Sequence, residues 1–335
     1  MRRGMLVLLV LFLSCFGFAE KKATLHGVMN PGGLQVDDSQ LYVSEAAAIY
    51  IYSLKDFKFI KKFGKQGEGP GEFVVHPRIQ PTVDASGDEL IINSFGKLSY
   101  FTKDGVFIKE FKVTPNNLLF QPLGNQFIAM RQTFEKDKLY NTVNLYNADL
   151  KKVKEIYRVD SGLRGPGKGV KVLEKAFSFQ VYKNKILIPG ETDDTIDVLD
   201  SDLKKLFTIK LDYKKLEVTQ DFKDKVVHFF KNSPQTKDIY ERLLKPVTFP
   251  DYFPVVRFFL AANKNIYVVT WKRENEKSEF FIYDMKGKFV KKLWIPMVFQ
   301  DILDPYPLTI KNDELYQLVE NVETEEWDLY AAEIK

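Results

Sequence analysis

The sequence predicts an all-β protein, a six-bladed β-propeller made of four-stranded antiparallel blades. One segment shape recurs along the chain: an alternating apolar strand, a turn rich in Asp, Asn, Gly or Lys, and a second strand. Aromatic residues make up 14% of the chain and Val and Ile are frequent, which favours strands over helices.

The recurring segments contain six matching positions whose spacing fits one propeller blade. The intervals between them are 49, 45, 53, 84 and 47 residues, and a blade takes about 40–50 residues. The long interval contains an insertion. The matching positions are Tyr52, Phe101, Tyr146, Leu199, Tyr283 and Tyr330.

Each unit contains four strands, a to d, because a further apolar strand and a tight polar turn precede each recurring hairpin. The last unit has strands a to c and then reaches Ile334. We expect the segment "ATLHGVM" (23–29) to supply its outer strand and to close the ring. The predicted propeller domain is 20–335.

The insertion, about 212–250, lies between blades 4 and 5, and its sequence predicts a pair of short helices. Residues 219–232 have Thr219 as a cap and apolar residues at helical spacing. Residues 233–245 have Ser233 as a cap and Pro234 at the first helical position. The pair either packs on the propeller face or forms a lid over the channel mouth.

Residues 1–19 are interpreted as a signal peptide. Arg2 and Arg3 precede an apolar stretch of about fourteen residues, whereas a membrane span needs about 20. Cleavage near Ala19 predicts a secreted or periplasmic protein with no transmembrane span. Two alternatives stay open: an uncleaved anchor, and a lipid anchor at Cys15, whose "FLSC" resembles a lipobox.

Charge and cysteine content exclude some classes of protein. The formal net charge is +4, or +2 without Arg2 and Arg3, and no basic stripe is present, so nucleic acid is not an expected partner. Cys15 is the only cysteine. A mature chain without disulfides must be stabilised by its apolar core.

A glycine-rich segment, "FGKQGEGPGEF" (63–73), follows the first unit. It is not a P-loop, which needs Lys and then Ser or Thr, because Glu72 and Phe73 follow its last glycine. "RGPGKG" (164–169) echoes it at the equivalent junction two blades later. We therefore expect a joint between blades, with Phe73 in the seam. The junction motif is Gly64, Gly67, Gly69, Pro70, Gly71, Glu72, Phe73 and Pro77.

With that motif, "TVDASGDELIINSFGKLSYFTKDGVFIKEF" (82–111) resembles the NHL-like six-bladed propellers, in particular the bacterial secreted type. The similarity is good over 33–111, weaker over 279–293 and faint elsewhere. Asn93 stands where the repeat usually has Asp. The resemblance implies a fold and not one function. Members of the family include protein-binding and RNA-binding modules, and related propellers include metal-dependent lyases and lactonases.

Strand parity predicts one plain face and one elaborated face. The a-to-b and c-to-d turns are short, whereas the d-to-a and b-to-c connections include the glycine loops, the insertion, 131–141 and 272–278. Long loops on a rigid scaffold commonly bind ligands. The candidate binding rim on this face is Arg131, Phe134, Arg164, Trp271, Lys272 and Arg273.

The sequence offers little support for catalysis. The three histidines, at 26, 76 and 228, do not recur at inner-strand positions, and no serine lies in a nucleophile elbow. No cofactor or metal site is predicted. Ca²⁺ is possible but unsupported, since the aspartates at 37, 38, 84, 193 and 194 read as turn formers. We expect a non-enzymatic binding or scaffold module for an unknown protein, small molecule or glycan. The alternative is a metal-dependent lyase, lactonase or hydrolase at the central channel.

Overall fold

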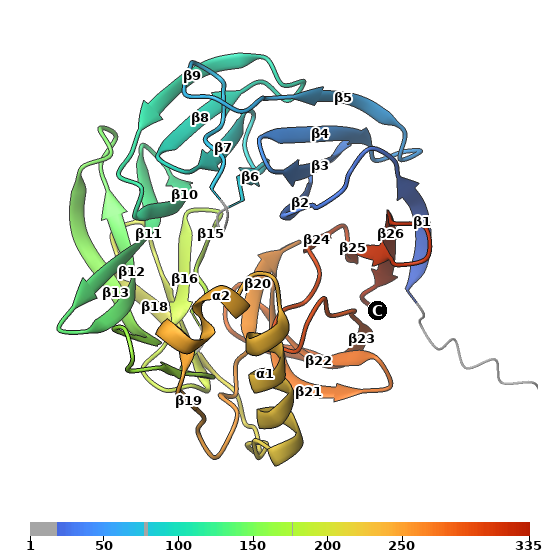
Figure 1. Ribbon diagram of the computed structural model, residues 1–335. Helices are drawn as coiled ribbons and strands as arrows, with labels where there is room; N and C mark the ends of the chain where they lie inside the picture. The colour runs from blue at the N-terminus through green and yellow to red at the C-terminus, as the bar shows by residue number, and fades with distance from the viewer. Residues whose placement is uncertain (1–18, 77–79, 176) are drawn as a thin grey trace, which may run out of the picture.

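The computed structural model describes residues 19–76, 80–175 and 177–335. The predicted signal peptide up to residue 18, with Cys15, and Pro77 of the junction motif lie outside these residues. Six sheets, each with four antiparallel strands, surround a central axis (Figure 1), which confirms the predicted six-bladed propeller.

The first three blades follow one another around the ring. Blade 1 consists of β2 (Gly33–Val36), β3 (Gln40–Glu45), β4 (Ala48–Ser53) and β5 (Phe59–Phe63). Blade 2 consists of β6 (Thr82–Asp84), β7 (Leu90–Ser94), β8 (Lys97–Phe101) and β9 (Phe107–Lys112). Blade 3 consists of β10 (Asn117–Leu123), β11 (Gln126–Glu135), β12 (Lys138–Tyr146) and β13 (Lys152–Arg164), extended by β14 (Val170–Lys171) and β19 (Val247–Thr248).

The last three blades complete the ring. Blade 4 consists of β15 (Gln180–Tyr182), β16 (Lys185–Pro189), β17 (Thr195–Leu199) and β18 (Lys205–Lys210). Blade 5 consists of β20 (Phe258–Ala262), β21 (Asn265–Glu274), β22 (Lys277–Asp284) and β23 (Phe289–Pro296). Blade 6 consists of β24 (Leu308–Lys311), β25 (Glu314–Asn321), β26 (Glu326–Glu333) and β1 (Glu20–Leu25).

The N-terminal strand β1 closes the ring, as predicted, by pairing antiparallel with β26. It begins three residues earlier than the segment expected to do so, at Glu20, and ends at Leu25 opposite Trp327. Asp328 holds the two strands together, because its carboxylate lies 2.8 Å from Lys21 Nζ and accepts a 2.7 Å hydrogen bond from Thr24. The outer edge of β26 is therefore covered.

The hydrophobic core lies in the six seams between neighbouring blades, with one cluster of buried side chains in each seam. The positions that marked the repeat have a common structural role in the first five blades. At each, the pairing between strands c and d shifts register, which bends the outer strand around the blade. The shifts occur at Tyr52, Phe101, Tyr146, Leu199 and Tyr283.

The insertion contains the predicted first helix, α1 (Gln220–Asn232), whose Phe222 N–H is capped by Thr219. The predicted second helix is wrong at its start. Ser233 ends α1, because its backbone is extended before Pro234, and its N–H bonds to the carbonyl of Phe229. Helical structure resumes only in the short α2 (Lys237–Ile239) and the π-helical turn η1 (Tyr240–Leu244).

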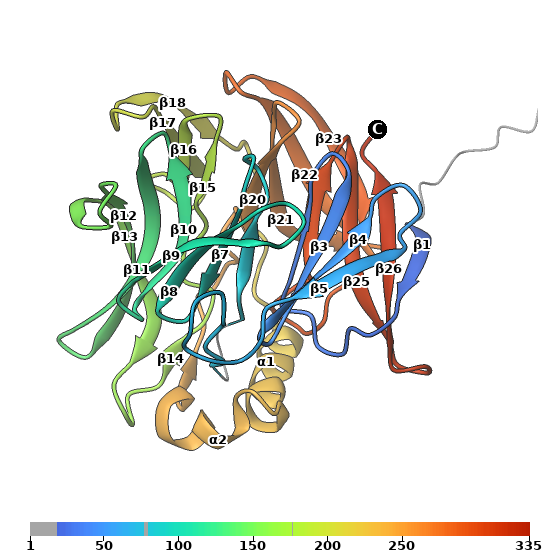
Figure 2. The same ribbon diagram turned by 90° about the horizontal axis from the view of Figure 1, so that it is seen from above.

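The helices lie on the face that carries the long connections, opposite the short a-to-b turns (Figure 2). A seventh hydrophobic cluster fixes them there, with Val226, Phe230 and Leu244 packed against Val172 and Leu303. The insertion therefore packs against residues of the propeller that come from two sides of the ring, Val172 after blade 3 and Leu303 before blade 6.

Two expected b-to-c loops are strands instead. β11 and β12 pair out to Glu135 and Lys138, and β21 and β22 pair out to Glu274 and Lys277. Both tips are two-residue turns whose residues all have positive φ, from 45° to 66°, which is the geometry of tight hairpins. The candidate residues in these segments are carried on extended strands.

Candidate functional site

A pocket of about 1220 Å³ opens on the propeller axis, on the face with the short turns. The a-to-b turns of all six blades line it. The turns of blades 4, 5 and 6 are two residues long and both residues have positive φ, as at Lys183 and Asn184. Ring closure brings these six turns, far apart in the sequence, to one opening.

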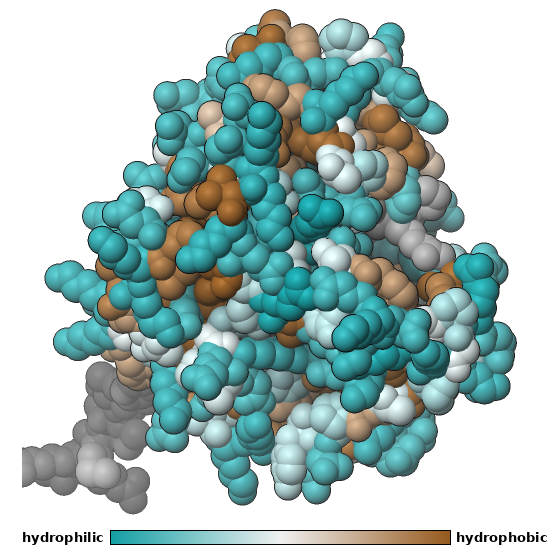
Figure 3. Space-filling view, turned by 90° about the vertical axis from the view of Figure 1, so that its left-hand side faces the viewer, coloured by the Kyte–Doolittle hydropathy of each residue, from teal (hydrophilic) through white to brown (hydrophobic). Residues whose placement is uncertain are grey.

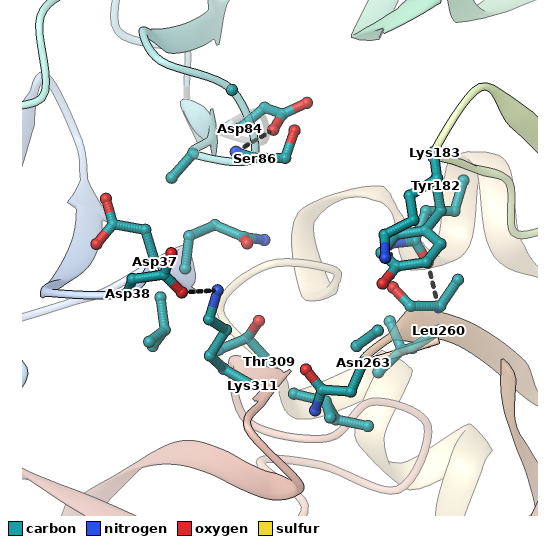
Figure 4. Close-up of a pocket in the computed structure, with 18 of the residues that line it drawn as sticks. Asp37, Asp38, Asp84, Ser86, Tyr182, Lys183, Leu260, Asn263, Thr309 and Lys311 are labelled. Atoms are coloured by element: carbon teal, nitrogen blue, oxygen red, sulfur yellow. Dashed lines mark hydrogen bonds and ion pairs between the residues drawn. The ribbon is translucent and has the colours of Figure 1, made fainter. Parts of the chain in front are cut away.

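Acidic side chains line the part of the pocket that blades 1 and 2 form. Asp37 and Asp38 come from the first turn, Asp84 ends β6, and Asp88 lies in the turn that follows it. Figure 4 shows Asp37, Asp38 and Asp84 at the opening. The Asp37 carboxylate stabilises its own turn, because it accepts 2.8 Å hydrogen bonds from the N–H groups of Ser39 and Gln40 and from the Tyr42 hydroxyl.

The pKa of Asp37 reflects these contacts. Burial pushes it upward, but the hydrogen bonds from Ser39, Tyr42 and Gln40, with the nearby Lys103, hold the pKa below its ordinary value. Asp37 therefore stays ionised as a structural carboxylate.

Basic side chains come mainly from the other side of the ring. Lys183 and Lys264 belong to the turns of blades 4 and 5, and Lys311 ends β24 of blade 6. Figure 4 shows Lys183 across the opening from Asp84. Lys311 Nζ lies 2.6 Å from Asp38, and Lys103 Nζ lies 3.2 Å from Asp37.

Three acids and two bases are then left in the pocket. Within the described part of the chain, no ion-pair partner lies within 4.0 Å of Asp84, Asp88, Asp313, Lys183 or Lys264. The pocket consequently presents negative charge from blades 2 and 6 and positive charge from blades 4 and 5. Such an arrangement can orient a polar ligand that carries both charges.

The glycine-rich segment, expected to be a joint, lies between β5 of blade 1 and β6 of blade 2. Phe73 is completely buried in the seam between blades 1 and 2, where its ring lies 5.9 Å from that of Phe101. The Glu72 carboxylate folds back to accept the Gly69 N–H at 2.9 Å and pairs with Lys65 at 2.9 Å. A side chain at Gly64, where φ is +83°, would collide with Phe73.

The second glycine loop joins the insertion to blade 3. Gly167 N–H bonds to the carbonyl of Arg242, and Val170 N–H bonds to that of Pro246. β14 and β19 then pair in parallel.

Three of the predicted rim residues lie on blade 3. Arg131 and Phe134 are on β11, and Arg164 ends β13, where its guanidinium makes bonds of 2.6 and 2.9 Å to both oxygens of Asp160. Phe134 is 55% exposed. Figure 3 views this side of the molecule, on which hydrophobic residues form small separate groups within a mostly hydrophilic surface.

The other three lie on β21 of blade 5, so blade 4 separates them from the first three. Trp271 stacks on Phe253 at 5.1 Å, Lys272 lies over Trp294 at 5.4 Å, and Arg273 lies over Phe299 at 3.9 Å. The six residues therefore do not form one continuous rim.

No metal centre emerges from the described residues. In the ranges 19–76, 80–175 and 177–335, no group of three or more His, Cys, Asp or Glu side chains could hold a metal ion. His26 pairs with Glu326 at 2.8 Å, His76 stacks on Phe95, and His228 is on α1. The metal-dependent alternative gains no support from this arrangement.

The axial pocket is not among the predicted sites, because the short turns were expected to form a plain face. The residue types at these turns contain the relevant pattern: Asp occurs at the turns of blades 1, 2 and 6, and Lys occurs in the turns of blades 4 and 5 and at the end of β24. Their opposition depends on the order of blades around the closed ring.

None of the helices in the described residues has the length and apolar character needed to cross a membrane.

Comparisons with known proteins support the fold. Residues 27–188 match the sequence profile of a family described as "6-bladed beta-propeller". No curated protein matches the chain in sequence.

Several solved structures are similar in shape. A Bacteroides fragilis protein described as exported has 11% identity and a TM-score of 0.55, with 94% of each chain covered. A luciferin-regenerating enzyme has 12% identity and a TM-score of 0.46, with 95% of each chain covered. Hsv2 of Kluyveromyces lactis has 11% identity and a TM-score of 0.40, with 91% of this chain and 74% of that chain covered.

Proposed function

We propose that this chain is a non-enzymatic binding module that holds a small polar ligand in its axial pocket. The observation that carries the proposal is the opposition of unpaired acidic and basic side chains around an opening of about 1220 Å³. A pocket of this size can accommodate a ligand of sugar or short-peptide size. The six turns belong to a rigid ring, so the site is organised before the ligand arrives.

The charge pattern favours a zwitterionic ligand. An ammonium group would lie toward Asp84 and Asp88, and a carboxylate would lie toward Lys183 and Lys264. Short peptides and amino sugars with an acid group have this chemistry. An entirely anionic or cationic ligand would meet like charge on one side of the pocket.

Thermal unfolding with four probes tests this proposal. We expect triglycine, a zwitterion, to raise Tm more than glucosamine, glucuronate or glucose at equal concentration. A ligand at ten times its Kd adds about 1.4 kcal/mol of stability, which is a shift of about 2–4 °C for a domain of this size. Asp84→Asn with Asp88→Asn should remove the shift.

The matched control is Asp149→Asn, which removes an exposed carboxylate on the outer part of blade 3. It should leave the shift produced by triglycine intact. Equal shifts for triglycine and neutral glucose, or an unchanged shift in the double variant, would contradict the proposed zwitterion site.

The binding role also fits an envelope or extracellular location. The predicted signal peptide over 1–19 supports export, with cleavage near Ala19. Mass determination of the mature N-terminus after secretion tests this part separately from ligand binding, and it distinguishes cleavage near Ala19 from lipidation at Cys15.

A further inference from the structure

Two arginines meet around one aromatic ring on the face that carries the long connections. Arg257 lies just before β20, and its guanidinium carbon is 4.2 Å from the centroids of both Trp271 and Phe299. The guanidinium carbon of Arg273 is 3.9 Å from the Phe299 centroid. Phe253 stacks on Trp271 and extends the aromatic wall. We call Arg257, Trp271, Arg273 and Phe299 the arginine–aromatic cluster.

The cluster is rich in hydrogen-bond donors that lack acceptors. Among the described residues, neither guanidinium has a carboxylate within 4.0 Å, and Arg257 donates to one carbonyl, that of Leu303. The indole Nε1–H of Trp271 is buried and has no hydrogen-bond acceptor among the described residues. Each of these groups can only donate, so the cluster lacks acceptors rather than donors.

The nearby acids do not supply those acceptors. Asp301 and Asp304 attract Arg257, and Glu276 attracts Arg273, but from beyond ion-pair distance. The Asp301 carboxylate already accepts the N–H groups of Leu303 and Asp304, at 2.7 and 2.8 Å.

Burial leaves the two positive charges poorly compensated. It lowers the pKa of Arg257 below its ordinary value, and the neighbouring Arg273 adds to the effect. Burial also lowers the pKa of Arg273. A largely desolvated guanidinium, Arg257, beside the second positive charge of the exposed Arg273 is costly unless an anion is shared between them.

We propose that the arginine–aromatic cluster binds an organic oxyanion, a carboxylate or phosphate attached to a flat apolar body. The planar guanidinium groups would bond the oxyanion in pairs. The Trp271 and Phe253 rings would pack against the apolar body. This site is separate from the axial pocket, which opens on the other face.

Isothermal titration calorimetry at low ionic strength tests the site with four probes: benzoate, phenyl phosphate, phenol and inorganic phosphate. Benzoate and phenyl phosphate should bind saturably. Phenol lacks the charge and inorganic phosphate lacks the apolar body, so each should bind at least about tenfold more weakly, as expected for the loss of one charge-assisted or stacking contribution.

Arg273→Gln is the main variant, because Arg273 is exposed and its substitution leaves the core intact. It should weaken binding of the better organic probe about tenfold or more. Lys272→Gln is the matched control: it removes the same charge one residue away, where the side chain lies over Trp294. It should change affinity less than about twofold, since it lies outside the donor set.

Arg257→Lys provides an independent check. It keeps the positive charge but removes the planar guanidinium group that can make two parallel hydrogen bonds. Affinity for the organic anions should therefore fall, while Tm stays close to that of the parent protein. Asp84→Asn, in the axial pocket, should leave the affinity unchanged. Equal losses in Arg273→Gln and Lys272→Gln would show nonspecific charge attraction and overturn the proposal. Full affinity in Arg273→Gln, or no saturable binding of either organic anion, would also overturn it.

Discussion

At the scale of single residues, Lys97 shows how the fold uses a buried charge. Lys97 is 4% exposed, and its ammonium donates to the carbonyls of Glu68 and Gly69, both at 2.7 Å. It also lies 3.3 Å from the Glu110 carboxylate. The glycine-rich joint turns its carbonyls inward toward this cation. The joint is thus fixed by polar contacts as well as by Phe73.

Replacement of Lys97 by Met should therefore destabilise the protein strongly. The carbonyls and the Glu110 carboxylate would lose their buried partner, which costs about 2–4 kcal/mol of unfolding free energy. Urea unfolding followed by circular dichroism measures this loss. Lys151→Met, at an exposed position, should cost less than about 0.5 kcal/mol. Similar losses in both variants would mean that the joint holds its shape without the cation.

Some residue roles were beyond the reach of the sequence because the partner lies in another blade. Asn93 departs from the repeat, yet its amide exchanges hydrogen bonds with the backbone of Phe120, at 2.7 and 3.2 Å. Gln180 makes the same pair of contacts with Ala261, at 2.6 and 3.1 Å. Each amide clamps neighbouring blades near the axis. The residue type is visible in the sequence, but its partner is identified only after blades are placed.

At the scale of elements, strand type was predictable and hairpin length was not. Residues 131–141 combine charged and apolar side chains without a Gly at the turn, so they resemble a loop. In the structure Lys136 and Asp137 supply both left-handed turn residues, and the strands continue to the tip. The hairpin projects beyond the blade, so neither of its faces is fully buried. Its sequence therefore lacks the alternation of apolar and polar residues that identifies a strand with one buried face.

The closure strand should make stability sensitive to acid through Asp328. Burial raises the pKa of Asp328, but hydrogen bonds from Lys21 and Thr24 outweigh it and hold the pKa below its ordinary value. A carboxylate with a lowered folded-state pKa stabilises the protein above its unfolded pKa of about 4, and this contribution is lost as pH falls through the folded pKa.

Urea unfolding at pH 5.5 and pH 3 measures this contribution. The parent protein should lose more stability between the two pH values than Asp328→Asn does. Asp149→Asn, at an exposed site, should behave as the parent protein. The same acid-induced loss in the parent and in Asp328→Asn would rule out Asp328 as the sensitive group.

Two glycines in the second glycine loop allow the cost of backbone strain to be measured apart from the cost of disturbing the contact with the insertion. Gly167 and Gly169 have similar φ values, +73° and +76°, but an added Cβ meets nothing at Gly167 and overlaps Pro246 at Gly169. Gly167→Ala should cost about 1–2 kcal/mol from the left-handed backbone alone. Gly169→Ala should cost more and should also speed amide hydrogen exchange in the insertion. Equal effects would show that the contact with Pro246 is unimportant.

At the scale of the whole molecule, repetition made the ring predictable, and ring closure created what could not be predicted. Six similar units with a missing outer strand imply a closed propeller. The axial pocket needs one further fact, namely which turns face each other across the axis. Asp84 and Lys183 are unrelated in the sequence and meet at the pocket because blades 2 and 4 lie on different sides of it.

The arrangement of the core predicts one cooperative ring with a separately melting insertion. Each seam cluster joins two blades, so the six clusters form a closed chain of contacts. Phe73→Ala should cost about 3–5 kcal/mol and should shift the whole unfolding transition. Fluorescence of Trp271, Trp294 and Trp327, which lie in blades 5 and 6 outside the mutated seam, should move together with the circular dichroism of the sheets.

Phe230→Ala should behave differently, because Phe230 belongs to the cluster that packs α1 and η1 on the propeller. Opening of the insertion leaves the six seams intact, so amide exchange should accelerate in 220–244 while the strands around Trp327 stay protected. Hydrogen exchange with mass spectrometry resolves the two regions. Faster exchange throughout the ring in Phe230→Ala would place the insertion within the same cooperative unit. Separate transitions for blades 2 and 6 in Phe73→Ala would show that the ring unfolds in parts.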